Sequence, residues 1–285
     1  MEPRGAAHKG RRYALSDLWH KIPLSFPIRM VCGYHDGETG NTGDTMSQFP
    51  NPYVRRAETL EYGRATASVA EFLNAVYAWM CVGLATTAVV AWWVSTQDQL
   101  VRRIFSGGIF IALIIAELVL VWVISAAVNR ISTGVATGLF LVYSVLNGLT
   151  LSVIFLIYSL SAITATFVVT AGMFGAMSLY GYVTKRDLTA MGSFLLMGLV
   201  GLILASIVNA FWANSALYWV VTYAGVVIFL GLTAYDTQKM KEIGQAAAER
   251  GVDASRLAIV GSLSLYLDFI NLFLFMLRIM GNRRG

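Results

Sequence analysis

Charged residues are scarce in this sequence of 285 residues. Asp, Glu, Lys and Arg together make up 13%, whereas soluble domains carry about 25%. Hydrophobic residues make up 57%, and the mean hydropathy is +0.64. This composition excludes an ordinary soluble globular protein. The net charge of +5 comes from polar flanks and a tail, so no nucleic-acid partner is expected.

Cysteine and histidine are also few. Cys32 lies in the N-terminal tail and Cys81 in the first apolar block, so a structural disulfide is not expected. His8, His20 and His35 all lie in the tail. No histidine lies in the apolar part of the chain, so imidazole-based catalysis or metal binding is not expected there. No cofactor is implied.

Residues 1 to about 65 hold all five prolines, many glycines and scattered basic residues, without a sustained apolar period. We expect this segment to be a disordered tail and residues 66–285 to form the membrane domain. The tail lacks the apolar core of a signal peptide. Met46 is an equally plausible start of translation, in which case part of the tail is not made.

Apolar residues come in seven blocks of about 20, the length that crosses the hydrocarbon of a bilayer. They predict an all-α membrane protein, a bundle of seven transmembrane helices. In the third block, Gly134 and Gly138 form a small-xxx-small pattern that predicts close helix packing. The blocks lie at roughly 70–94, 106–128, 134–158, 162–183, 190–212, 216–236 and 262–278.

Lys and Arg near the block ends predict the orientation. A cytoplasmic N-terminus places ten of these residues inside and five outside, and seven spans then place the C-terminus outside. The inside set is Arg55, Arg56, Arg64, Arg130, Lys185, Arg186, Lys239, Lys241, Arg250 and Arg256. The outside set is Arg102, Arg103, Arg278, Arg283 and Arg284.

The last apolar block carries a carboxyl group, Asp268, near its middle. An acidic residue at the centre of a membrane helix costs about 2.5–3.5 kcal/mol on insertion scales, so it needs a partner, a water-filled cavity or a proton. Gly261, Ser264 and Asn271 share one helix face with Asp268. We expect this face to point into the protein.

Three other polar residues lie in or near the apolar blocks. Asn147 is expected to make one interhelical hydrogen bond. Glu117 is equally consistent with a structural acid and with a residue of a permeation path. Asp236 ends the sixth block and precedes the loop that returns the chain to Asp268. The two carboxyl groups can share one proton if the sixth helix runs past Asp236 or the seventh starts later than predicted.

Two segments carry a resemblance to a known family: Ser264-Leu-Tyr-Leu-Asp268-Phe-Ile-Asn271-Leu-Phe and Ala234-Tyr-Asp236-Thr-Gln238. They resemble the signature of the Bax inhibitor-1 family, also called the transmembrane Bax-inhibitor-motif proteins. Its bacterial branch is further indicated by Asn147-Gly-Leu-Thr-Leu-Ser152 and by the stretch from Phe174 to Leu188. The resemblance covers roughly residues 68–281.

The resemblance implies a last helix that is central and wrapped by the other six. It also implies that Asp236 and Asp268 form a pH-sensing dyad beside a calcium-permeable path, with transient Ca²⁺ at the two carboxylates. Glu117 matches the acidic residue of the family's second helix. Arg130 is the nearest candidate for the family's arginine that pairs with the dyad, although it lies further from Glu117 than the pattern expects, and it is equally consistent with a basic residue that sets the topology on the inner side.

Two functions of different classes are consistent with these features. The first is a pH-sensitive calcium leak channel, because carboxylate oxygens suit a hard cation. The second is an interaction protein that modulates a membrane-bound ATP-dependent protease through the tail, a role that the resemblance suggests. No enzymatic activity is expected, because Leu265, Tyr266 and Leu267 replace the Gly-x-Gly that intramembrane aspartyl proteases place before an aspartate.

Overall fold

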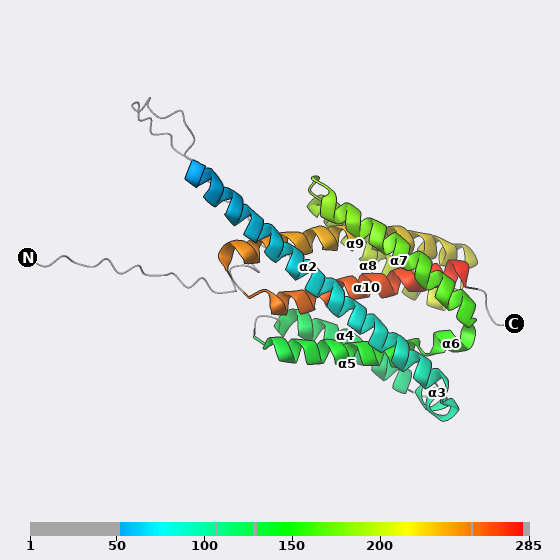
Figure 1. Ribbon diagram of the computed structural model, residues 1–285. Helices are drawn as coiled ribbons and strands as arrows, with labels where there is room; N and C mark the ends of the chain where they lie inside the picture. The colour runs from blue at the N-terminus through cyan, green and yellow to red at the C-terminus, as the bar shows by residue number, and fades with distance from the viewer. Residues whose placement is uncertain (1–51, 106–107, 128–129, 252, 282–285) are drawn as a thin grey trace, which may run out of the picture. The chain divides into compact units, whose positions relative to one another are not determined.

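The computed structural model describes residues 52–105, 108–127, 130–251 and 253–281, with side chains from residue 68 onward (Figure 1). The residues before 52, including Met46 and the three histidines, lie outside the described part. Seven helical segments in the described part are long and apolar enough to cross a bilayer, which confirms the predicted fold class. The helices are α2 (Pro52–Ser95), α3 (Asp98–Phe105), α4 (Ile109–Ala127), α5 (Thr133–Leu151), α6 (Val153–Ile157), α7 (Leu160–Val183), α8 (Thr189–Trp212), α9 (Ser215–Arg250) and α10 (Ser255–Met280).

Helix α2 begins at Pro52, so residues 52–65 are helical rather than part of an irregular tail. Proline suits the first turn of a helix, because its missing N–H would have no partner there. The Arg, Ala, Glu and Leu residues that follow favour helix in spite of their polarity. The prediction considered only apolar periodicity, which such a segment lacks.

Helix α9 continues to Arg250, well past the predicted end at 236. Its last residues are rich in Ala, Glu, Gln and Lys, which favour helix although they are not apolar. Gly251 then ends the helix in the left-handed conformation, with a φ of 60°. The condition for a meeting of Asp236 and Asp268 is therefore fulfilled by the length of α9.

The third span is interrupted at Ser152, between α5 and α6. The Ser152 hydroxyl donates to the carbonyl of Leu149 at 2.7 Å, a local bond that competes with the helical pattern. The short helix α3 was also not predicted, because its polar residues fall between two apolar blocks.

Helix α10 is the most buried span. In its most apolar window 72% of the residues are buried, against 44% or fewer in the other spans. It packs against α9, α2, α7 and α5 (Figure 1). Helix α4 packs mainly against α5, and α8 against α9. The last helix is therefore central, but four helices surround it directly, rather than the six that the resemblance implied.

Glycines mark the closest helix approaches, at other positions than predicted. Gly134 and Gly138 are exposed, and a Cβ atom at either would meet nothing within 4 Å. The small-xxx-small prediction is therefore wrong. A Cβ at Gly148 would instead lie 2.9 Å from the Thr87 carbonyl of α2, and one at Gly181 would collide with the Ala234 backbone of α9.

Candidate functional site

The structure brings Asp236 of α9 and Asp268 of α10 together. Their carboxyl groups are hydrogen-bonding neighbours. The Ser264 hydroxyl, one turn before Asp268, donates to Asp236 Oδ2. Asp268 is 5% exposed, and its Oδ2 atom accepts no hydrogen bond from the described residues. A hydrogen bond between two carboxyl groups needs a proton on one of them.

Lys239 supplies a positive charge near Asp236. It follows Asp236 by one turn of α9 and attracts its carboxylate. Its ammonium nitrogen also lies 5.9 Å from the centre of the Tyr235 ring. The predicted site residues Asp236, Asp268 and Ser264 thus form one cluster, to which Lys239 adds a cation that was not predicted as part of the site.

Gln238 connects α9 to the loop between α7 and α8. Its Oε1 atom accepts from the Leu188 N–H, and its Nε2 atom donates to the Arg186 carbonyl, both at 2.8 Å. Lys241 adds a bond to the Tyr182 carbonyl at 2.9 Å. Two segments that carry the family resemblance therefore meet through one side chain. The sequence alone does not indicate this role of Gln238.

The same loop starts α8. Asp187 accepts from the Thr189 N–H at 2.8 Å, and the bonds from the Thr189 side chain and backbone lower the pKa of this exposed carboxyl. Leu188 is buried against Ala234 and Tyr235. The loop is therefore ordered and packs on the side of α9, next to Asp236.

Glu117 lies apart from the acidic pair, in a polar cluster between α4 and α5. Thr150 donates to its Oε1 at 2.9 Å, and the Asn147 amide donates to its Oε2 at 3.4 Å. The Asn147 amide also donates to the Tyr143 hydroxyl at 3.3 Å. The single interhelical bond predicted for Asn147 is confirmed. Both oxygens of Glu117 are engaged, which favours the structural alternative for this acid.

Tyr266 extends polar contacts to another face of α10. Its hydroxyl pairs with Thr87 Oγ1 at 2.7 Å, and Thr87 donates to the Ser144 carbonyl at 2.9 Å. The Tyr143 ring meets the Tyr266 ring edge-on, with centroids 5.8 Å apart. The bond between Tyr266 and Thr87 could not be predicted, because the two residues are 179 positions apart in the sequence.

Two predicted site residues do not join the acidic pair. The Asn271 amide donates to the Leu267 carbonyl of its own helix at 2.8 Å. Arg130 is exposed in the turn between α4 and α5, and no side-chain bond to the pair is present. The position of Arg130 therefore favours the alternative, a charge at a helix end that sets the topology.

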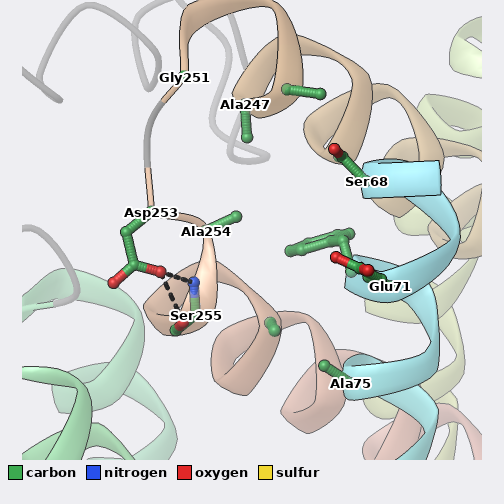
Figure 2. Close-up of a pocket in the computed structure, with 12 residues that line it drawn as sticks. Ser68, Glu71, Ala75, Ala247, Gly251, Asp253, Ala254 and Ser255 are labelled. Atoms are coloured by element: carbon green, nitrogen blue, oxygen red, sulfur yellow. Dashed lines mark hydrogen bonds between the residues drawn. The ribbon is translucent and has the colours of Figure 1, made fainter. Parts of the chain in front are cut away.

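A cavity of about 380 Å³ opens where α2, the end of α9 and the start of α10 converge (Figure 2). Glu71 and Asp253 lie on its lining. Asp253 accepts from the Ser255 hydroxyl and N–H, which lowers the pKa of this exposed acid. Neither Asp236 nor Asp268 lines the cavity. Across the described residues, no three His, Cys, Asp or Glu side chains gather as a metal site.

Seven apolar helices, with an acidic residue inside the most buried one, define a polytopic α-helical membrane protein. A sequence profile of the family described as "Inhibitor of apoptosis-promoting Bax1" matches residues 69–285. The chain belongs to this family, the Bax inhibitor-1 family, which confirms the resemblance.

Relatives are found in several bacteria. The inner membrane protein YbhL of Escherichia coli K12 is 51% identical over 243 residues, covering 84% of this chain and all of YbhL. An uncharacterised protein of Borreliella burgdorferi is 48% identical over 216 residues, 75% of this chain and 93% of its own. One from Deinococcus radiodurans is 44% identical over 216 residues, 76% of this chain and 92% of its own.

Proposed function

We propose that this protein is a pH-sensitive calcium leak channel of the inner membrane, controlled by an aspartate dyad. The observation that carries the proposal is the contact of the Asp236 and Asp268 carboxyl groups inside the bundle. Two carboxylates in contact repel each other strongly in a medium of low dielectric constant. A proton shared between them removes that repulsion, so the contact between α9 and α10 depends on pH.

The oxygen atoms at the dyad suit calcium. Carboxylate and hydroxyl oxygens are hard ligands of the kind that Ca²⁺ prefers, and Ser264 adds one hydroxyl to the two acids. Calcium usually takes six to eight oxygens, so a site of two carboxylates holds it weakly. Weak and transient binding is what a permeation path requires. Calcium is here the transported ion, and the acids have no catalytic role in this proposal.

The relative YbhL is named as an inner membrane protein, and this supports the same membrane for the present chain. The alternative, control of a membrane-bound ATP-dependent protease, depends on a tail that lies outside the described residues. A variant without residues 1–45 separates the two functions. Deletion of the tail leaves a leak intact, whereas it abolishes a contact made by the tail.

The test is calcium flux into liposomes that contain the purified protein, measured from pH 6 to 8. Asp236→Asn and Asp268→Asn keep the side-chain shape and remove a titratable group. Each should abolish the pH dependence or move its midpoint by more than about one pH unit, equivalent to about 1.4 kcal/mol. The double variant should add little, because the two residues act as one unit.

Asp253→Asn is the matched control, since this acid is exposed and lies outside the dyad. Its pH profile should match that of the wild type. A response that changes in Asp268→Asn alone would show that the two acids do not act as a pair. Wild-type protein that conducts no calcium at any pH would refute the channel.

A further inference from the structure

Helix α7 carries three buried hydroxyl groups that have no hydrogen-bond partner in the described part of the chain. They belong to Thr166, Thr170 and Ser178. Thr166 and Thr170 are completely buried, and Ser178 is 7% exposed. The carboxyl oxygen Oδ2 of Asp268, on the neighbouring α10, is also buried and accepts no hydrogen bond from the described residues.

The other buried serine and threonine hydroxyl groups in the described residues are all satisfied. Thr222 and Thr233, for example, donate to carbonyls one turn earlier in α9, at 2.8 and 2.7 Å. On the exposed side of α7, Thr164 does the same with Leu160. The full set of satisfied groups is Thr87, Ser144, Thr150, Ser152, Thr222, Thr233, Thr237 and Ser262. The exceptions are therefore confined to one helix.

The three unpartnered hydroxyls share one face of α7, because they are separated by four and eight residues. Phe174 lies between them on the same face, with its ring 5.4 Å from that of Phe269 in α10. Below them, Gly181 touches the backbone of Ala234 in α9. The hydroxyl face therefore lies against α9 and α10, the two helices that carry the dyad.

A buried hydroxyl without a partner costs about 1–3 kcal/mol. A threonine in a helix avoids this cost by bonding to its own backbone one turn earlier, and the three residues do not do so. Water molecules, or a hydrated ion that moves along this face, would satisfy these groups one after another. Glu117 offers no comparable opening, because both of its oxygens are already bonded.

We propose that the conduction path of the leak follows this face of α7, and that it carries a hydrated cation past Ser178, Thr170 and Thr166. The path begins at Asp268 and extends over 12 residues of α7, about 18 Å of a hydrocarbon layer of about 30 Å. Neutral hydroxyl oxygens replace part of the hydration shell along the way, as backbone carbonyl oxygens do in potassium channels. This inference rests on the proposed function.

Cysteine accessibility tests the path without measuring flux. In a background with Cys32→Ser and Cys81→Ser, Thr166→Cys and Thr170→Cys are each reacted in liposomes with a water-soluble thiosulfonate reagent. Val168→Cys is the control, since Val168 is 64% exposed on the lipid side of the same helix. A thiol in lipid stays protonated and unreactive. We expect mass addition at positions 166 and 170 and none at 168.

Flux supplies the second measurement. Thr170→Val removes the hydroxyl at nearly constant shape, and should lower calcium flux roughly tenfold because the interaction with a charge is lost. Thr170→Ser restores the hydroxyl and should recover most of the flux. Thr222→Val is the control, because the Thr222 hydroxyl is equally buried but satisfied by its own helix.

The outcomes separate the two proposals. A wild-type leak with a pH response, together with unmodified cysteines at 166 and 170 and normal flux in Thr170→Val, overturns the path and leaves the channel standing. A wild type that conducts no calcium overturns both, even if the cysteines react. Reactive cysteines with reduced flux in Thr170→Val, rescued by Thr170→Ser, support the path.

Discussion

At the scale of single residues, the amide side chain of Gln238 joins α9 to the loop between α7 and α8. Gln238 is 8% exposed and uses both ends of its amide, accepting from Leu188 and donating to Arg186. It follows Asp236 by two residues, so the same bonds fix the height of Asp236 relative to α7 and α8. A polar group used this fully is costly to remove, since the Leu188 N–H is left buried without a bond and the Arg186 carbonyl loses its partner.

Gln238→Leu should lower the free energy of unfolding by about 2 kcal/mol, because two backbone groups lose their partners. Thermal unfolding in detergent measures the change. Gln245→Leu, at an exposed position of the same helix, should change stability by less than about 0.5 kcal/mol. Equal losses in the two variants would show that the Gln238 bonds are not important to the fold.

The acidic pair could be suggested from sequence because consecutive antiparallel helices pack together. Ser264 was correctly placed on the inward face, but its bond to Asp236 depends on the register of α9 and α10. Asn271 was placed on the same face, and its amide bonds to its own backbone instead. Glu117 and Asn147 are 30 residues apart, and no local pattern identifies such partners.

At the scale of helices, α7 and α9 approach most closely where Gly181 meets Ala234. There is no room for a side chain, since a Cβ would collide with the Ala234 carbonyl. This contact sets the spacing between the hydroxyl face of α7 and the helix that carries Asp236.

Gly181→Ala should therefore destabilise the protein by about 1–3 kcal/mol through overpacking. Gly175→Ala, in the same helix, is the control, because its Cβ would meet nothing within 4 Å. Alanine favours helix over glycine by up to about 1 kcal/mol, so Gly175→Ala should be neutral or stabilising. Unfolding in detergent compares them, and a neutral Gly181→Ala would contradict the close contact.

The membrane spans were predictable because long apolar runs have few alternatives in a bilayer. The parts that were missed are polar. The end of α9, the start of α2 and the whole of α3 form helices whose residues are compatible with water. The break at Ser152 could not be predicted, because Ser262 makes the same kind of local bond within an unbroken helix.

At the scale of the whole molecule, most basic residues of the described part lie at one end of the spans, with Arg102, Arg103 and Arg278 at the other. Lys185 and Arg186 follow α7, while Lys239, Lys241 and Arg250 lie in the second half of α9. Positive residues favour the cytoplasmic side. We therefore expect the turn after Gly251 to be cytoplasmic and the C-terminus to be outside.

Reporter fusions test this orientation. A reporter inserted in the turn after Gly251 should give a cytoplasmic signal, and one fused after Gly285 should give an outside signal. A fusion in the turn between α8 and α9, near Ala213, serves as the control and should also report outside. A cytoplasmic signal at Gly285 would contradict seven spans with an inside N-terminus.

Helix α4 touches little of the protein. In its most apolar window 6% of the residues are buried, and Glu117 supplies its hydrogen bonds to α5. Its 19 residues extend about 28 Å, close to the thickness of the hydrocarbon layer. Few neighbouring side chains therefore hold its tilt, and tilting is one way in which a transmembrane helix adapts to bilayer thickness. We expect a thicker or thinner bilayer to tilt α4 against α5 while α9 and α10 stay in place. A change in lipid length would then alter the contacts of Glu117, at the centre of α4, before it alters those of Asp236 and Asp268.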